Sequence, residues 1–202
     1  MNEELERELI EQVKKHPYKL AFVEDQTEAI CLAAVKRDGS TLCYVRHQSE
    51  NICLAAVKQD GFALNYVEKE TEELCLAAVK QDALALQFVE NQTEKICLAA
   101  VKSEGSALQY VKNQTANICK EALKNNFNAI AYIKDIKEKS IAMIVLKASL
   151  LSHTKDKIIL TKIVKIFNKD KEIVDFYTKH KLWKYVDFSE LDIKLTQYSM
   201  IL

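Results

Sequence analysis

Five of the six cysteines recur at a fixed spacing of 22 residues, and thiols are the side chains best able to bind a metal or change redox state. Zinc sites group their thiolates about two to four residues apart, and no such group occurs here. If each repeat forms one layer of helices, neighbouring layers lie ~8–10 Å apart, whereas a disulfide needs Cα atoms within ~7 Å. We therefore expect small, buried hydrophobic side chains, with no metal and no cofactor. The column is Cys31, Cys53, Cys75, Cys97 and Cys119; Cys43, outside it, is the thiol expected to be reachable.

The remaining residues give little reason to expect an enzyme. The four histidines, His16, His47, His153 and His180, are far apart in the sequence. The chain contains no HExxH, GxSxG, P-loop or GxGxxG motif, the patterns that carry common hydrolytic and nucleotide chemistry. We expect no catalytic residues and a function other than catalysis.

A lysine column follows the same 22-residue period and could contact phosphates. An acidic column stands two residues later, and residues 1–119 carry 13 basic and 19 acidic side chains. The expected role is therefore a solvated edge whose lysines are neutralised by the acidic neighbours. The lysines are Lys14, Lys36, Lys58, Lys80, Lys102 and Lys124, and the acidic residues are Asp38, Asp60, Asp82 and Glu104.

These columns belong to a longer repeat that must position them. A phrase close to ICLAAVKQDGFAL begins at Ile30, Ile52, Leu74, Ile96 and Ile118, always 22 residues apart. Glycine and proline are scarce, and the central Ala-Ala pair favours helix over strand. The period predicts an all-α solenoid of helix-turn-helix repeats, with about six units in residues 1–139 and a capping helix at 1–15.

Each unit is expected to contain two short helices. The first would begin after an N-cap hydroxyl, supplied by Thr27, Ser49, Thr71, Thr93 or Thr115. It would end at a glycine with positive φ, at Gly39, Gly61 or Gly105. The third unit has Ala83 at the glycine position. Because alanine is strained at positive φ, we expect an irregular turn at residues 81–85.

The period fades after residue 139, and residues 140–202 are expected to form three or four longer helices that cap the solenoid. Residues 120–202 carry 16 basic and 10 acidic side chains, so the C-terminal region is net basic. One helix is basic and amphipathic, so a basic surface at Lys155, Lys162, Lys165 and Lys169 is a hypothesis for nucleic-acid binding. No apolar run reaches the ~20 residues of a membrane span, and the acidic start is no secretory signal. A cytoplasmic protein is expected.

The words Ala55-Ala56-Val57-Lys58-Gln59-Asp60-Gly61 and Ala63-Leu64 resemble a family of short helical repeats that is catalogued as a domain of unknown function. The family occurs in large DNA viruses and intracellular bacteria. The resemblance covers about residues 28–134. It implies a helical repeat scaffold in a viral or host-interacting setting and supplies no catalytic residues.

Differences between units indicate where a partner could bind, because packing constrains the core columns. The residue after the glycine column is Ser40, Phe62, Leu84 or Ser106. Phe62 and Leu84, with Asn65 and Gln87 one helical turn later, form the predicted partner-binding patch. The alternative is that Phe62 and Leu84 pack on a neighbouring helix.

The main functional hypothesis is a non-enzymatic repeat protein that binds a protein partner, acting by steric occupation or as a scaffold. A second hypothesis, from the resemblance, is a viral or phage inhibitor of a host defence nuclease. A third is nucleic-acid binding through the basic C-terminal region.

Overall fold

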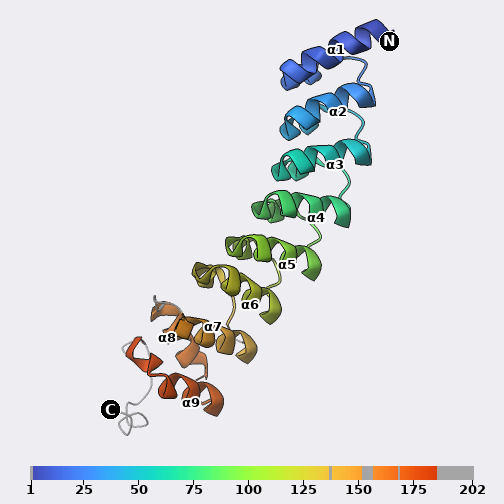
Figure 1. Cartoon of the computed structure of the whole chain (residues 1–202). Coiled ribbons are helices and arrows are strands. Elements are labelled where there is room, and N and C mark those ends of the chain that lie inside the picture. The colour runs from blue at the N-terminus through green and yellow to red at the C-terminus, as the bar shows by residue number, and fades with distance from the viewer. Residues whose placement is uncertain (1, 137, 152–156, 168, 186–202) are drawn as a thin grey trace.

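The computed structural model describes residues 2–136, 138–151, 157–167 and 169–185. The chain forms an elongated stack of helices, with the N-terminus at one end and the C-terminal helices at the other (Figure 1). The all-α solenoid with 22-residue units is confirmed, and no strand occurs in the described residues.

Each unit pairs one α-helix with one 3₁₀ helix of six residues. The α-helices are α1 (Glu3–Lys15), α2 (Glu28–Arg37), α3 (Glu50–Gln59), α4 (Glu72–Gln81), α5 (Glu94–Ser103) and α6 (Ala116–Asn125). The 3₁₀ helices are η1 (Pro17–Phe22), η2 (Gly39–Tyr44), η3 (Gly61–Tyr66), η4 (Ala83–Phe88), η5 (Gly105–Tyr110) and η6 (Phe127–Tyr132). Consecutive α-helices pack on one another, as do consecutive 3₁₀ helices, so the stack has two layers.

The core lies between the two layers and repeats with the sequence. In α3 the buried side chains are Ile52, Cys53, Ala56 and Val57, and η3 adds Leu64. Ala56 is fully buried, and its small side chain allows the close approach of neighbouring units. The apolar half of the phrase therefore builds the stack.

The predicted N-caps are confirmed. The side chains of Thr27, Ser49, Thr71, Thr93 and Thr115 each accept a hydrogen bond from the backbone N–H three residues later. Most of these hydroxyls also donate to a glutamate of the preceding unit; Ser49 Oγ, for example, lies 2.9 Å from Glu28 Oε1. The hydroxyl at this position thus starts a helix and, in most units, also joins that helix to the preceding unit.

The predicted positive φ at the glycines is wrong, because no glycine has one. The glycines serve close approach instead. A Cβ on Gly61 would lie 2.7 Å from the carbonyl oxygen of Ala78 in the next unit, and the Gly61 N–H donates to Gln81 Oε1 at 2.7 Å.

The predicted irregularity at residues 81–85 is also wrong. Helices α4 and η4 have the lengths of their counterparts, and Asp82 has φ −142° and ψ 118°, as Asp60 has −142° and 114°. Ala83 has a negative φ and is therefore unstrained. The residue twenty positions later is Ser103, where the glycine units have Gln59, Gln81 and Asn125. The unit with alanine in place of glycine therefore has a shorter side chain, that of Ser103, at the position that faces it.

After the sixth unit come α7 (Lys139–Leu151), α8 (Lys157–Phe167), α9 (Lys171–Lys179) and η7 (Leu182–Tyr185). Helix α7 packs on α6, and α7, α8 and α9 pack on one another. Lys139 Nζ joins α7 to α9 through Asp170 Oδ2 at 3.1 Å and Glu172 Oε2 at 2.8 Å. The fourth C-terminal helix, predicted near residues 188–200, lies outside the described residues.

Candidate functional site

The predicted patch lies on the 3₁₀ layer and is only partly assembled. Phe62 is 36% exposed, and its ring meets that of Phe88 edge-to-face at a centroid distance of 5.6 Å. Leu84 is half-buried and packs against the core. Gln87 donates to the carbonyl oxygen of Leu84 in its own unit, while Asn65 is exposed. Phe62 thus packs on the next unit and keeps part of its ring in solvent.

The predicted basic surface of the C-terminal region is partly described. Lys162 and Lys165 are exposed on α8, and Lys169 is exposed just before α9. Lys155 lies outside the described residues. The opposite side of α8 buries residues including Ile159, Leu160, Ile163 and Val164, so this helix is anchored by its apolar face.

The cysteine column is buried, as predicted, and Cys43 is exposed. Burial raises the pKa of each column thiol, to about 11 for Cys75 and Cys119. Thiols that stay protonated are poor nucleophiles and poor metal ligands. Among the described residues, no group of three or more His, Cys, Asp or Glu side chains could hold a metal ion.

A glutamine column, which the sequence reasoning overlooked, ties three parts of the stack together. Gln92 Nε2 donates to the carbonyl oxygens of Leu86, at 3.2 Å, and Tyr110, at 2.9 Å. Its Oε1 accepts from the Lys112 N–H at 2.8 Å and from the Cys97 thiol at 3.8 Å. Gln26 and Gln114 bridge in the same way, and Gln48 makes the bond to the next unit. We call this arrangement the glutamine bridge.

The third unit has Glu70 at this position. Glu70 accepts two bonds from the Glu90 N–H, at 3.0 and 3.2 Å. A carboxylate cannot donate to the carbonyls of Leu64 and Phe88 that a glutamine would reach. The bridge was detectable in the sequence as Gln26, Gln48, Glu70, Gln92 and Gln114, one residue before each N-cap.

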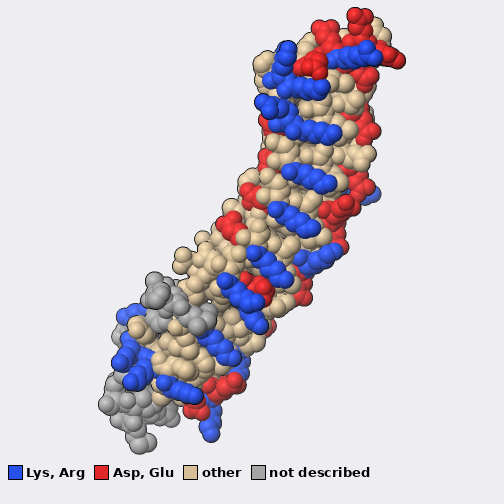
Figure 2. Space-filling model, viewed as in Figure 1, with Lys and Arg blue, Asp and Glu red and all other residues tan. Residues whose placement is uncertain are grey.

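The face formed by the α-helices carries the most regular surface. In the four central units each helix exposes a lysine, at Lys36, Lys58, Lys80 and Lys102, which we call the lysine row. One turn before each lysine stand a half-buried leucine and alanine, such as Leu54 and Ala55. Figure 2 shows the row of basic side chains running down the stack, with uncharged surface between them and acidic side chains along one edge.

The lysine row is exposed, as predicted, but within the described residues it forms no ion pairs with the acidic column. In the described part of the chain, none of its four members forms an ion pair with a carboxylate. The acidic column is used elsewhere: Asp38, Asp60 and Asp82 each accept a backbone N–H at the start of a 3₁₀ helix.

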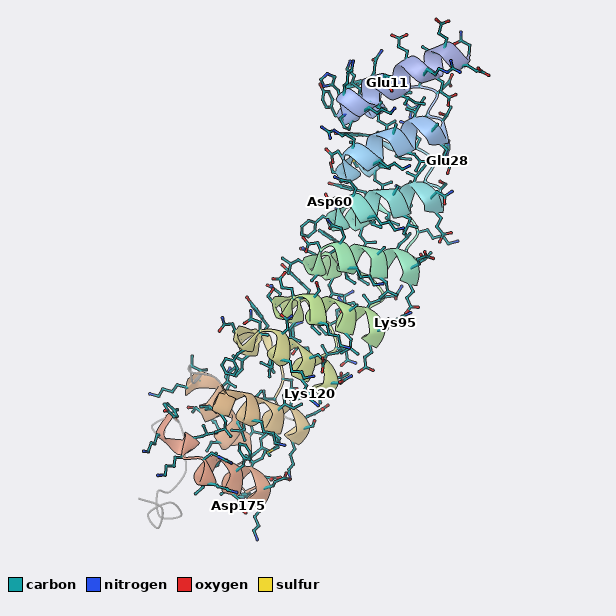
Figure 3. The ribbon with its side chains drawn as sticks, viewed as in Figure 1. Glu11, Glu28, Asp60, Lys95, Lys120 and Asp175 are labelled. Carbon is teal, nitrogen blue, oxygen red and sulfur yellow. The ribbon has the colours of Figure 1, made fainter. Side chains whose placement is uncertain are left out.

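Open grooves separate the α-helices on this face. One is lined by residues including Leu32, Lys36, Leu54 and Lys58, the next by Leu54, Lys58, Leu76 and Lys80, and another by Leu98 and Lys102. At the other rim stand the glutamates of the first helical turns. In Figure 3, Glu28 and Lys95 lie on that rim and Asp60 on the opposite edge of the stack.

The regular face ends at both terminal units. Where the central units have Ala33, Ala55, Ala77 and Ala99, the first and sixth units have Glu11 and Glu121. Glu11 pairs with Lys14 at 2.7 Å and Glu121 with Lys124 at 3.1 Å. The unpaired lysines and apolar grooves are thus confined to the four central units.

Three overlapping stretches, residues 28–71, 49–93 and 71–115, match a family model described as a domain of unknown function (DUF4116). The repeat array is similar to this family. The DUF4116 matches begin about one unit apart and together span residues 28–115, which contain the lysine row. No curated protein and no solved structure matches the chain. No helix in the described residues is long and apolar enough to cross a membrane.

Proposed function

We propose that the protein is a non-enzymatic repeat scaffold that binds a protein partner along the face of its α-helices. The observation that carries the proposal is a surface that repeats in four successive units, with an exposed lysine and a half-buried leucine on each α-helix. The lysines of the row lack ion-pair partners within the described chain. The units behind them are joined by the glutamine bridge, which is present in every central unit except the third, and by most of the N-cap hydroxyls.

Such a surface suits binding because it is held in place before the partner arrives. A preformed site loses little conformational entropy on association, so weak contacts in successive units can add up. In this proposal the terminal segments, α1 and residues 140–202, act as caps that cover the ends of the core. The protein acts by steric occupation or by holding its partner in place.

The setting proposed is the cytoplasm, or the host cytoplasm for a viral or bacterial effector. Inhibition of a host defence nuclease is one form of steric occupation that fits the proposal. Nucleic-acid binding through Lys162, Lys165 and Lys169 is the rival proposal, and it would be strongest at low salt because it is electrostatic.

Cross-linking of the intact protein in its native cell, followed by mass spectrometry, tests the proposal. The expected result is one protein partner whose cross-links map to α2–α5 and survive nuclease treatment. Cross-links that vanish with nuclease and map to α8 would replace protein binding by nucleic-acid binding.

A further inference from the structure

The lysine row presents four positive charges that pair with no carboxylate of the described residues, at a spacing set by the repeat. Neighbouring packed helices lie ~8–10 Å apart, so four consecutive units place their ammonium groups on a line ~25–30 Å long. The row is Lys36, Lys58, Lys80 and Lys102, all exposed. A complementary partner is therefore an elongated anion.

A parallel rim of glutamates, of which Glu72 is paired with Lys95 at 3.2 Å, limits how wide that anion is. Glu28, Glu50, Glu72 and Glu94 stand eight residues before the lysines of their own helices. Eight residues of α-helix correspond to about 12 Å. A nucleic-acid duplex, or an α-helix ~10–12 Å across, would extend from the lysine row to this rim. A single extended peptide fits between the two rows.

The repeat spacing also selects the conformation of the peptide. A polyproline II segment has three residues per turn and rises ~3.1 Å per residue, so every third side chain points the same way at intervals of ~9.3 Å. In a β-strand, side chains alternate between faces, and residues three apart point in opposite directions. Only the first geometry matches one acidic side chain to each unit.

We propose that the four central units bind an extended segment of a protein partner in which every third residue is Asp or Glu. This rests on the proposed function and specifies its partner. The intervening residues of the segment lie over the grooves lined by Leu32, Leu54, Leu76 and Leu98, which favour apolar side chains. The segment is about 12 residues long, three for each of four units.

The paired ends of the face support this length. At the first and sixth units the ammonium groups of Lys14 and Lys124 already contact Glu11 and Glu121. These glutamates also replace the alanine of the groove. A longer acidic segment would have to displace an existing ion pair at each end, so it gains little beyond the central four units.

The test uses fluorescence anisotropy with the full chain and a labelled peptide, (Glu-Pro-Leu)₄. A second peptide has the same composition with its four glutamates contiguous. The first is expected to bind about tenfold or more tightly than the second, and to weaken as salt rises. The double variant Lys58→Glu, Lys80→Glu should lose binding by about tenfold or more, because each change places like charges face to face.

A matched control changes the same charge at two exposed lysines away from the row, Lys69→Glu and Lys171→Glu. It should bind the periodic peptide like the wild type and melt like it, whereas Lys58→Glu, Lys80→Glu should stay folded at the assay temperature with a melting temperature lowered only by the loss of two cations from the last turns of α3 and α4. Equal binding of the two peptides would overturn the spacing argument, and absence of binding at about 1 mM peptide would overturn the proposal as a whole.

Three further results would overturn the proposed acidic segment, and each shows separately whether protein binding itself still stands. If a helix-forming peptide with acidic residues seven apart bound more tightly than (Glu-Pro-Leu)₄, the partner segment would be helical and not extended. If a single-stranded 12-mer RNA bound more tightly than the peptide, and Lys58→Glu, Lys80→Glu lost that binding, the ligand would be a nucleic acid and not a protein. A native protein partner that cross-links to Lys58→Glu, Lys80→Glu as well as to the wild type would support the proposed function but contradict the proposed acidic segment.

Discussion

The glutamine bridge predicts that Glu70→Gln stabilises the protein. The new amide would donate to the carbonyl oxygens of Leu64 and Phe88, as Gln92 donates to those of Leu86 and Tyr110. Each bond contributes about 0.5–1.5 kcal/mol net. Against this gain, the acceptor for the Glu90 N–H changes from a carboxylate to a neutral amide, which costs about 1 kcal/mol.

The net gain is about 1 kcal/mol, or roughly 2–4 °C in melting temperature for a chain of this size. The reverse change, Gln92→Glu, removes two donors from half-buried carbonyls. It is expected to lower the free energy of unfolding by about 1–2 kcal/mol. The two substitutions therefore have opposite signs, because the first adds an amide donor at this position and the second removes one.

Urea unfolding followed by circular dichroism at pH 7 measures both variants. Gln87→Glu is the matched control, because Gln87 is exposed and its amide contacts only the carbonyl of Leu84 in its own unit. It should change stability by less than about 0.5 kcal/mol. The reasoning is refuted if Glu70→Gln destabilises the protein, or if Gln92→Glu and Gln87→Glu cost the same.

Four further outcomes follow from contacts elsewhere in the stack. Gly61→Ala should cost about 1–3 kcal/mol in urea unfolding, because its Cβ would lie 2.7 Å from the Ala78 carbonyl oxygen; an unchanged midpoint would contradict this. Phe62→Ala should lower stability by about 0.5–1.5 kcal/mol through loss of the Phe88 contact, and lost binding with unchanged melting would instead favour the partner-binding patch. In the folded protein a thiol reagent should modify Cys43 rapidly and the five buried thiols only on unfolding. The free energy of unfolding should fall from about pH 9 to about pH 11, because the unfolded thiols ionise near 9.0 while the raised pKa values keep the folded ones protonated; replacing buried cysteines by alanine should flatten that slope.

The sequence alone predicted the period, the helices, their N-caps and the buried cysteines, because each depends on a repeated local rule. A hydroxyl directly before a helix-forming apolar run, for example, favours an N-cap whatever the rest of the fold. The role of the glycines could not be predicted from a local rule. Glycine serves both positive φ and close backbone approach, and only the position of the next layer shows that Gly61 faces the Ala78 carbonyl.

The chain did contain a clue to that approach. Gly39, Gly61 and Gly105 are each followed twenty residues later by Gln59, Gln81 or Asn125, whose side-chain oxygen accepts the glycine N–H. Ala83 is instead followed by Ser103. Two columns that change together across units indicate contact between layers, and the glutamine bridge could have been found by the same comparison.

The exposed columns divide into those that vary between units and those that do not. Beside the lysine row, the next position reads Arg37, Gln59, Gln81 and Ser103, and its change from glutamine to serine accompanies the change from glycine to Ala83 in the contact described above. The lysine itself is unchanged through all six units and the leucine before it through the central four, although the lysines are exposed and the leucines only half-buried. Packing explains repetition at buried positions but does not require an exposed lysine at each layer. Looking for variation between units selects Phe62, whereas looking for exposed residues that stay constant selects the lysine row. A cation in the last turn of each helix suits the helix dipole, but that preference does not require lysine in every unit, and a surface that repeats so regularly is best matched by a ligand that repeats at the same interval.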